Sequence, residues 1–186
     1  MIEATKRLLR ELEIFGKSND GYYNIPPDTG NLLHILVRSS RAKNILEIGT
    51  SNGYSTIWLA EAVKHNNGRV TTVEISEHKV KLAQENFKRA NLSDTITIIQ
   101  GDVLHVIPKL DEKFDFLFID AVKEDYVKYL KLAYSKLNSN ALILADNAIM
   151  FEKLMKEYLK YVREHKGLRS VLVPIGSGVE LSLKIG

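Results

Sequence analysis

The sequence contains no cysteine in its 186 residues, so disulfide bonds and thiolate metal sites are excluded. It also has no apolar run near the roughly 20 residues of a membrane span, and its N-terminus lacks a signal-peptide core. Its net charge of +3 is too small to indicate a nucleic-acid surface, which usually concentrates basic residues in a stripe. These absences predict a cytoplasmic protein with neither a membrane nor a nucleic acid as its partner.

The remaining composition is that of an ordinary globular protein. Hydrophobic residues make up 45% of the chain and charged residues 26%, which is typical of globular domains. A chain of this length can bury a proper core within one domain. We therefore expect a single domain over residues 1–186.

Two helices are predicted before the first strand. Apolar residues from Leu8 to Phe15 lie at helical spacing among charges, so residues 2–15 should form an amphipathic helix. Turn-forming residues fill 16–27, and a second helix follows them and continues to Val37. The apolar stripe of the first helix can pack on the body of the protein or on a second copy, so a homodimer is one of the expectations.

From residue 44 onward, short apolar runs alternate with helical patterns. Such alternation is typical of βαβ units, in which helices join parallel strands. The last two apolar runs flank Gly176-Ser177-Gly178 and predict a closing antiparallel hairpin. The predicted fold class is therefore α/β, a Rossmann-like doubly wound sheet of seven mostly parallel strands. The expected strands are 44–48, 69–74, 95–100, 114–119, 141–145, 170–174 and 179–185, and the expected helices are 54–65, 77–90, 103–109, 123–136 and 150–165.

In an open parallel sheet, ligands bind at the carboxyl ends of the strands, near the point where the strand order reverses. The first such end is the turn from Gly49 to Gly53, where backbone N–H groups can meet a negatively charged ligand group. The two glycines would let the main chain approach the ligand without a Cβ in the way. Ser51 stands where a dinucleotide-binding loop requires glycine, which weakens a pyrophosphate interpretation.

Acidic residues follow the second and third strands. Glu74 could accept hydrogen bonds from both hydroxyls of a ribose, or could be a solvated charge beside a helix cap at Ser76. Asp102 could accept from the exocyclic amine of an adenine, although an N-cap of the next helix is the more common use of such a residue. These residues alone leave both alternatives open.

Three oxygen donors follow the fourth and fifth strands, namely Asp120, Asp146 and Asn147. Hard oxygen ligands with room for water and substrate suit Mg²⁺ or a similar cation, and not zinc. The alternative is that these residues cap strand ends and form turns. Lys123 stands at the start of a helix, where the helix dipole disfavours a cation. Beside a metal site, such a lysine is a candidate general base.

Together these residues resemble the class I S-adenosylmethionine-dependent methyltransferases, and more narrowly the cation-dependent O-methyltransferases that include the catechol and caffeoyl-CoA enzymes. The resemblance covers nearly the whole chain. Its specific part consists of two motifs that look like the family's metal and base motifs, Phe118-Ile119-Asp120-Ala121-Val122-Lys123 and Leu144-Ala145-Asp146-Asn147. The motifs that resemble the family's cofactor site are Asn24-Ile25 with Gly30, Leu46-Glu47-Ile48-Gly49, Gly53-Tyr54-Ser55, Glu74 and Gly101-Asp102-Val103.

The resemblance implies an enzyme that transfers a methyl group from S-adenosyl-L-methionine to a hydroxyl of a small, catechol-like aromatic acceptor, with Mg²⁺ or another divalent cation. It implies that residues 1–40 cover the cofactor and substrate side of a core formed by residues 41–186. Lys123 is the implied base, and the implied metal ligands are Asp120, Asp146 and Asn147. The implied cofactor-binding residues are Ile25, Glu47, Gly49, Thr50, Ser51, Gly53, Tyr54, Ser55, Glu74, Ile75, Gly101, Asp102, Val103 and Asp120.

Three departures from the family concern the acceptor. Almost no loop separates Asn147 from the helix at 150–165, where family members commonly carry a longer insert. Val122 occupies a position that is usually polar or aromatic, and residues 170–174 contain no acidic group to hold a second acceptor hydroxyl. We therefore expect an open acceptor pocket, and a preference for catechols is not simply inherited from the family.

Three other functions are alternatives. The run Gly49-Thr50-Ser51-Asn52-Gly53 matches a serine hydrolase's nucleophile elbow, with Asp146 and His165 in hydrolase order, but that fold needs several strands before the elbow. Methylation of RNA or protein by the same fold is the second alternative, although no Asn-Pro-Pro-aromatic segment follows the fourth strand. A non-catalytic S-adenosylmethionine-binding domain is the third, and the retention of Lys123 with the three oxygen donors argues against it.

Overall fold

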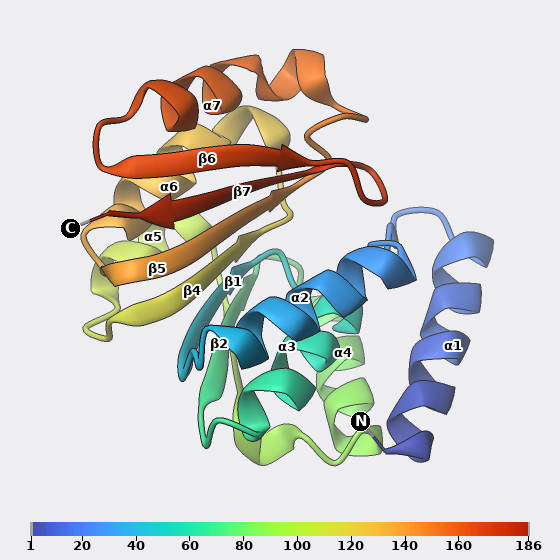
Figure 1. The fold of residues 1–186 in the computed structure, drawn as a ribbon. Helices are drawn as coiled ribbons and strands as arrows, with labels where there is room; N and C mark the ends of the chain where they lie inside the picture. Colours follow the sequence, from blue (N-terminus) through green and yellow to red (C-terminus); the bar gives the residue numbers. More distant parts are fainter. Residues whose placement is uncertain (1, 186) are drawn as a thin grey trace.

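Figure 1 shows the computed structural model, which describes residues 2–185 as a twisted sheet with helices on both of its faces. The strands of this described part lie in the order β3-β2-β1-β4-β5-β7-β6, and β7 runs antiparallel to both of its neighbours. The predicted fold class is confirmed. The strands are β1 (Asn44–Ile48), β2 (Arg69–Glu74), β3 (Ile96–Gln100), β4 (Phe114–Ile119), β5 (Leu137–Asp146), β6 (Leu168–Val173) and β7 (Val179–Lys184).

The predicted helices are present, and two of them are interrupted. Instead of one helix over 103–109, α5 is followed by a 3₁₀ turn, because Pro108 has no N–H to continue the helical hydrogen bonds. The helix expected at 123–136 begins as a 3₁₀ turn and continues as α6. No helix within residues 2–185 has the length and apolarity required to cross a membrane. The α-helices are α1 (Glu3–Ser18), α2 (Pro27–Ser39), α3 (Tyr54–Lys64), α4 (Glu77–Arg89), α5 (Val103–Val106), α6 (Tyr126–Tyr134) and α7 (Glu152–Glu164).

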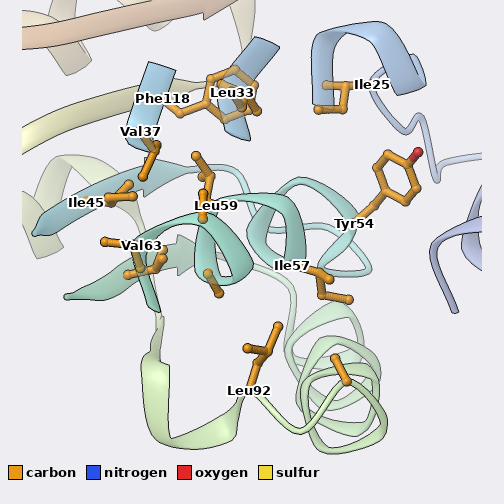
Figure 2. Packing of buried hydrophobic residues seen from close by; sticks show 14 of the residues in the cluster. Ile25, Leu33, Val37, Ile45, Tyr54, Ile57, Leu59, Val63, Leu92 and Phe118 are labelled. Carbon is orange, nitrogen blue, oxygen red and sulfur yellow. The ribbon is translucent and has the colours of Figure 1, made fainter. Parts of the chain in front are cut away.

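The strands alternate their side chains between two hydrophobic cores. Ile45 and Phe118 face the core beneath α1 to α4, whereas Leu46 and Ile119 face the core beneath α5 to α7. Figure 2 shows the first of these cores, where α2 and α3 lie against β1. The sheet is thus buried on both faces, as expected for parallel strands joined by helices.

Helix α1 packs on the body of the protein. It contacts α3 and α4 and buries Leu8, Leu9 and Leu12 to 4% exposure or less. The apolar stripe of α1 was expected to pack either on the body of the protein or on a second copy, and within the described residues it packs on the body. The homodimer stays a prediction.

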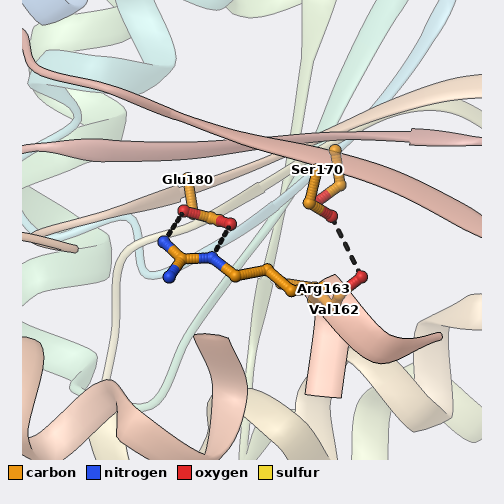
Figure 3. Close-up of polar contacts among 5 residues, drawn as sticks. Val162, Arg163, Ser170 and Glu180 are labelled. Carbon is orange, nitrogen blue, oxygen red and sulfur yellow. Dashed lines mark hydrogen bonds and ion pairs between the residues drawn. The ribbon is translucent and has the colours of Figure 1, made fainter. Parts of the chain in front are cut away.

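Helix α7 is attached to the closing hairpin by polar contacts (Figure 3). The guanidinium of Arg163 donates to both carboxylate oxygens of Glu180 at 2.8 and 2.7 Å, and Glu180 is fully buried in β7. The Ser170 hydroxyl of β6 donates to the Val162 carbonyl at 3.1 Å. These contacts hold the hairpin, and therefore the loop at its tip, in a fixed place beside β5.

The register of the central strands aligns their carboxyl ends. Ile48 pairs with Val73 of β2 and with Ile119 of β4, and Ile119 pairs with Ala145 of β5. The chain runs outward from β1 to β3 and then returns to β4, so the strand order reverses between β1 and β4. The residues that follow these strands consequently meet at the edge where ligands bind in this architecture.

Candidate functional site

A pocket of about 380 Å³ lies at this switch point, over the ends of β1, β2 and β4. Its walls come from the turn after β1, the end of β2, the start of α5 and the segment after β4. Most of the wall residues in those segments were predicted from the sequence. The predicted site residues among them are Gly49, Ser51, Glu74, Ile75, Asp102, Val103, Asp120 and Lys123, and the pocket is also lined by Gly21, Tyr23, Val73, Lys79, Ala121, Val122 and Tyr129.

A second, much smaller cavity of about 10 Å³ adjoins the turn after β1. It is lined by the segment before α2 and by the first turn of α3, which contains Tyr54 and Ser55. Ile25 is buried in the hydrophobic core and also lines this cavity. The predicted site residues that line it are Ile25, Thr50, Ser51, Tyr54, Ser55 and Asp120.

The two glycines of the turn are required for packing within the protein. Gly49 has a φ of +99°, and a Cβ there would lie 2.1 Å from the Asp120 carbonyl oxygen. Gly53 has a φ of +86°, and its Cβ would lie 2.5 Å from the Phe87 ring. The glycines therefore allow close packing within the protein, between β1 and β4 and between α3 and α4. Gly49 also lines the larger pocket, and the expectation that the glycines let the main chain approach a ligand stays a prediction.

Glu47 lies beneath the turn and does not line either cavity. It is fully buried, and its carboxylate accepts hydrogen bonds from Ser55 at 2.6 Å, Thr56 at 2.5 Å and Thr72 at 2.6 Å. The Thr72 hydroxyl is also 2.6 Å from that of Thr50. Burial raises the pKa of Glu47 to about 7, against the opposing effect of the three hydroxyl donors. The structure thus gives Glu47 a supporting position under the turn from Gly49 to Gly53.

Glu74 is buried to 8% exposure, so the alternative of a solvated charge is wrong. Its two carboxylate oxygens accept hydrogen bonds from the backbone N–H groups of Ser51 and Ser76, each at 2.9 Å. Each oxygen keeps a lone pair, and the residue lines the larger pocket. Ser51 itself has a φ of 50°, and its buried hydroxyl has no partner within the described residues.

Asp102 caps α5, which was the more common use expected of it. Its carboxylate accepts from the backbone N–H of Leu104 at 2.8 Å, and its other oxygen lies 3.3 Å from a ring nitrogen of His105. The same side chain also lines the pocket, so capping and ligand contact are compatible. Gly101 does not line the pocket, but its neighbours Asp102 and Val103 do.

The segment after β4 brings a lysine and a carboxylate into direct contact. The Lys123 amine donates to Asp120 Oδ1 at 2.8 Å, and both side chains are less than one fifth exposed. The amine also lies 5.4 Å from the centre of the Tyr126 ring and 5.9 Å from that of Phe151. It is therefore held between a carboxylate and two aromatic rings at the side of the pocket.

Asp146 is the last residue of β5, beside the strand end that Asp120 follows, and it does not line the pocket. It is 1% exposed, and both of its oxygens accept from the Ser177 hydroxyl at 3.1 Å. Burial, and then the charge of Asp120, raise the pKa of Asp146 to about 7. Asn147 follows with a φ of 72°, a conformation that asparagine tolerates better than most residues.

The donor set at this edge suits a hard cation when the amide of Asn147 is included. Within residues 2–185 there is no cluster of three or more His, Cys, Asp or Glu side chains arranged for a metal. The available donors are the carboxylates of Asp120 and Asp146 and the amide oxygen of Asn147. This set fits Mg²⁺ or Mn²⁺ and not a softer metal.

The short connection after β5 is confirmed. Residues 147–151 form a tight turn, in which the Phe151 N–H donates to the Asn147 carbonyl at 2.9 Å, and α7 begins at the next residue. Ile149 and Met150 are 49% and 66% exposed, and Val122 on the opposite segment is 56% exposed. The rim beside Lys123 is therefore apolar and uncovered within the described residues.

The hydrolase alternative is wrong in its geometry. The ring of His165 packs against Tyr134 and Tyr161, and its Nδ1 accepts from the Gly167 N–H at 3.0 Å. The Ser51 hydroxyl makes no hydrogen bond to any described residue, so no serine–histidine pair exists.

Solved structures share this fold. An O-methyltransferase from Bacillus cereus, solved in complex with SAH, superposes with a TM-score of 0.86 at 28% identity, over 96% of this chain and 90% of that one. The O-methyltransferase TomG from Streptomyces achromogenes, solved in complex with SAM, gives a TM-score of 0.85 at 26% identity, over 100% and 91%. The fold is therefore that of a Rossmann-like methyltransferase. A family model described as O-methyltransferase matches residues 3–185, and the chain belongs to this O-methyltransferase family.

Two similar relatives carry a more specific name. A catechol O-methyltransferase from Niastella koreensis is 39% identical over 138 residues, which are 72% of this chain and 62% of that protein. A catechol O-methyltransferase from Mycobacterium tuberculosis is 33% identical over 156 residues, 77% of this chain and 70% of that protein. The matched part is thus less than two thirds of the Niastella protein's own length.

Proposed function

We propose that this protein is an S-adenosylmethionine-dependent O-methyltransferase that requires a divalent cation and acts on a small hydroxylated aromatic acceptor. The observation that carries the proposal is the position of Lys123 against Asp120, beside Asp146 and at the side of the switch-point pocket. We expect it to act in the cytoplasm as one domain over residues 1–186, and a homodimer stays a prediction.

The pocket suits a nucleoside that carries a sulfonium group. Glu74, with a free lone pair on each oxygen, would accept the ribose hydroxyls, and Asp102 with Val103 would border the adenine. Ser55 and Ile25 would face the methionine end, at the small cavity beside the turn. When bound, S-adenosylmethionine supplies a methyl group on a positively charged sulfur, which makes that carbon open to attack by an oxygen nucleophile.

The carboxylates at the ends of β4 and β5 provide a reason for the cation. Asp120 and Asp146 stand at neighbouring strand ends, and Asp146 is almost completely buried. Two carboxylates in such a place repel each other, and a divalent cation is the partner that removes this repulsion. Asn147 would complete the ligand set. When bound, the cation stabilises the ionised form of an acceptor hydroxyl.

Lys123 is the group that would take the proton. A phenol loses its proton near pH 10, so forming a phenolate at pH 7 costs about 4 kcal/mol without help. Asp120 and the rings of Tyr126 and Phe151 fix the lysine amine at the pocket wall, where the acceptor hydroxyl must lie to face the methyl group. In the transfer, the acceptor oxygen forms a bond to the methyl carbon and the carbon–sulfur bond breaks, leaving S-adenosylhomocysteine. The hydroxyl proton goes to the lysine amine, which must be in its neutral form to accept it.

The exposed rim favours an aromatic acceptor over a charged polymer. Val122, Met150 and Phe151 offer an apolar surface on both sides of Lys123, against which a flat ring can pack. We propose that the acceptor site is open, and we therefore expect broader tolerance among diphenols than a walled pocket would permit.

The test is methyl transfer from radiolabelled S-adenosylmethionine to a panel of vicinal diphenols, with Mg²⁺ and then with EDTA. We expect transfer to oxygen with Mg²⁺ and its loss with the chelator. Transfer to RNA or protein but to no diphenol would contradict the proposed aromatic acceptor. Binding of the cofactor without any methyl transfer would contradict the proposal that the protein is an enzyme. Transfer that continues at the same rate in EDTA would contradict the cation requirement.

A further inference from the structure

The loop at the tip of the β6–β7 hairpin reaches across the end of β5. Its Ser177 is 7% exposed, and its hydroxyl donates to both carboxylate oxygens of Asp146 at 3.1 Å. A single hydroxyl shared between the two oxygens of one carboxylate restricts rotation of that carboxylate. The contact was not predicted from the sequence, because Ser177 and Asp146 are far apart along the chain.

The loop is fixed on the segment that follows Asp146 by its main chain as well. The Ser177 carbonyl accepts from the N–H groups of Ile149 and Met150, both at 3.0 Å, and the Gly178 carbonyl accepts from Ala148 at 2.8 Å. Gly178 has a φ of +86°, and a Cβ there would lie 2.4 Å from the Ile149 side chain. A residue larger than glycine does not fit at position 178, so the loop packs closely against residues 148–150.

The same loop also packs against the start of α2. A Cβ on Gly176 would lie 2.5 Å from the Thr29 hydroxyl oxygen and 2.9 Å from the Pro26 ring. Pro26 directly follows Ile25, which closes the small cavity beside the cofactor turn. The loop is therefore held from two sides, and its serine is presented to Asp146 by a rigid support.

We infer that Ser177 is a positioning residue for the divalent cation, acting through Asp146. The hydroxyl lies within hydrogen-bond distance of both carboxylate oxygens, and the Asn147 backbone N–H also donates to this carboxylate. Without the hydroxyl, the Asn147 N–H alone would orient the Asp146 carboxylate, and part of its population would point away from the cation. Groups that hold a metal ligand in this way typically contribute a factor of 10–100 in metal affinity. This inference rests on the proposed cation requirement.

The test is the affinity for Mn²⁺ alone, measured by electron paramagnetic resonance on the full chain without cofactor or acceptor. We expect Ser177→Ala to raise the dissociation constant for Mn²⁺ about 10–100-fold, whereas Ser177→Thr keeps the hydroxyl and restores most of the affinity. The matched control is Ser170→Ala in the same hairpin, whose hydroxyl contacts Val162 and Ser182 and not Asp146. We expect this control to bind Mn²⁺ as the wild type does.

Binding of S-adenosylhomocysteine, measured by calorimetry on each variant, separates a local effect from misfolding. A partly unfolded sample lowers the stoichiometry of both ligands, whereas loss of positioning weakens Mn²⁺ alone. Ser177→Ala with the wild-type Mn²⁺ affinity would overturn the role of Ser177 and leave the proposed function intact. A wild-type protein that binds no Mn²⁺ would contradict the cation requirement itself, and the inference with it.

Discussion

The buried carboxylate of Glu47 predicts how the stability of the protein depends on pH. Its pKa is raised from 4.5 to about 7, chiefly by burial. The folded state therefore holds a proton on Glu47 between these values that the unfolded state releases. The resulting stabilisation is fully present below pH 4.5 and is lost as the pH rises through 7. Replacement of Glu47 by glutamine removes the titrating group and keeps the shape of the side chain.

The size of the effect follows from the shift. A difference of one pKa unit corresponds to about 1.4 kcal/mol, so the shift of Glu47 corresponds to about 3 kcal/mol over its whole range. Between pH 5 and pH 8, the Glu47 contribution to the free energy of unfolding should fall by about 2.5 kcal/mol. Asp146 acts in the same direction, because its pKa is also raised to about 7, but it is present in both proteins and cancels in the comparison.

The measurement is urea unfolding of the wild type and Glu47→Gln at pH 5 and pH 8, in chelator so that no cation contributes. We expect the wild type to lose about 2–3 kcal/mol more than the variant between the two pH values. The matched control is Glu157→Gln on the exposed side of α7, which should follow the wild type. An equal loss in the wild type and Glu47→Gln would refute the assignment of a buried, protonated carboxyl to this position.

Three further variants test the packing and the site. Arg163→Ala leaves the buried Glu180 carboxylate without its cation and should cost about 2–4 kcal/mol in the free energy of unfolding, less than a fully buried pair because the guanidinium is half exposed. Gly49→Ala should lower the free energy of unfolding by at least about 2 kcal/mol. The control Gly21→Ala, which has a similar φ but nothing within 4 Å of its Cβ, should lower it by about 1 kcal/mol. Equal losses of stability would contradict the close packing at Gly49. Lys123→Met should lower kcat about 10²–10⁴-fold and leave the affinity for S-adenosylhomocysteine unchanged, and an unchanged kcat would exclude it as the base.

The fold and the location of the site were accessible from the sequence because they depend on local patterns. Alternating strands and helices predict a parallel sheet, and the carboxyl ends of its strands are a common edge. The sequence pattern alone therefore predicts that Glu74, Asp120 and Lys123 lie beside one pocket. The extra length of β5 was not predicted, since Leu137 joins the sheet by pairing with Phe114 across an irregularity in register.

The parts that were missed depend on contacts between distant segments. Gly49 must lack a Cβ because the Asp120 carbonyl lies against it. Glu47 is unavailable to a ligand because its carboxylate accepts from Thr72, which lies on another strand. Ser177 was recognised only as part of a turn. Its contact with Asp146 requires that β7 pair with β5, which a hairpin pattern alone does not reveal.

The cation requirement is tested most directly by the initial rate of methyl transfer as a function of free Mg²⁺, for the wild type and Asp146→Ala. We predict a rate that rises from near zero in EDTA to saturation in the wild type. The variant should require at least about tenfold more Mg²⁺ to reach half of its own maximum. A wild-type rate that is the same in EDTA as in saturating Mg²⁺ would contradict the account.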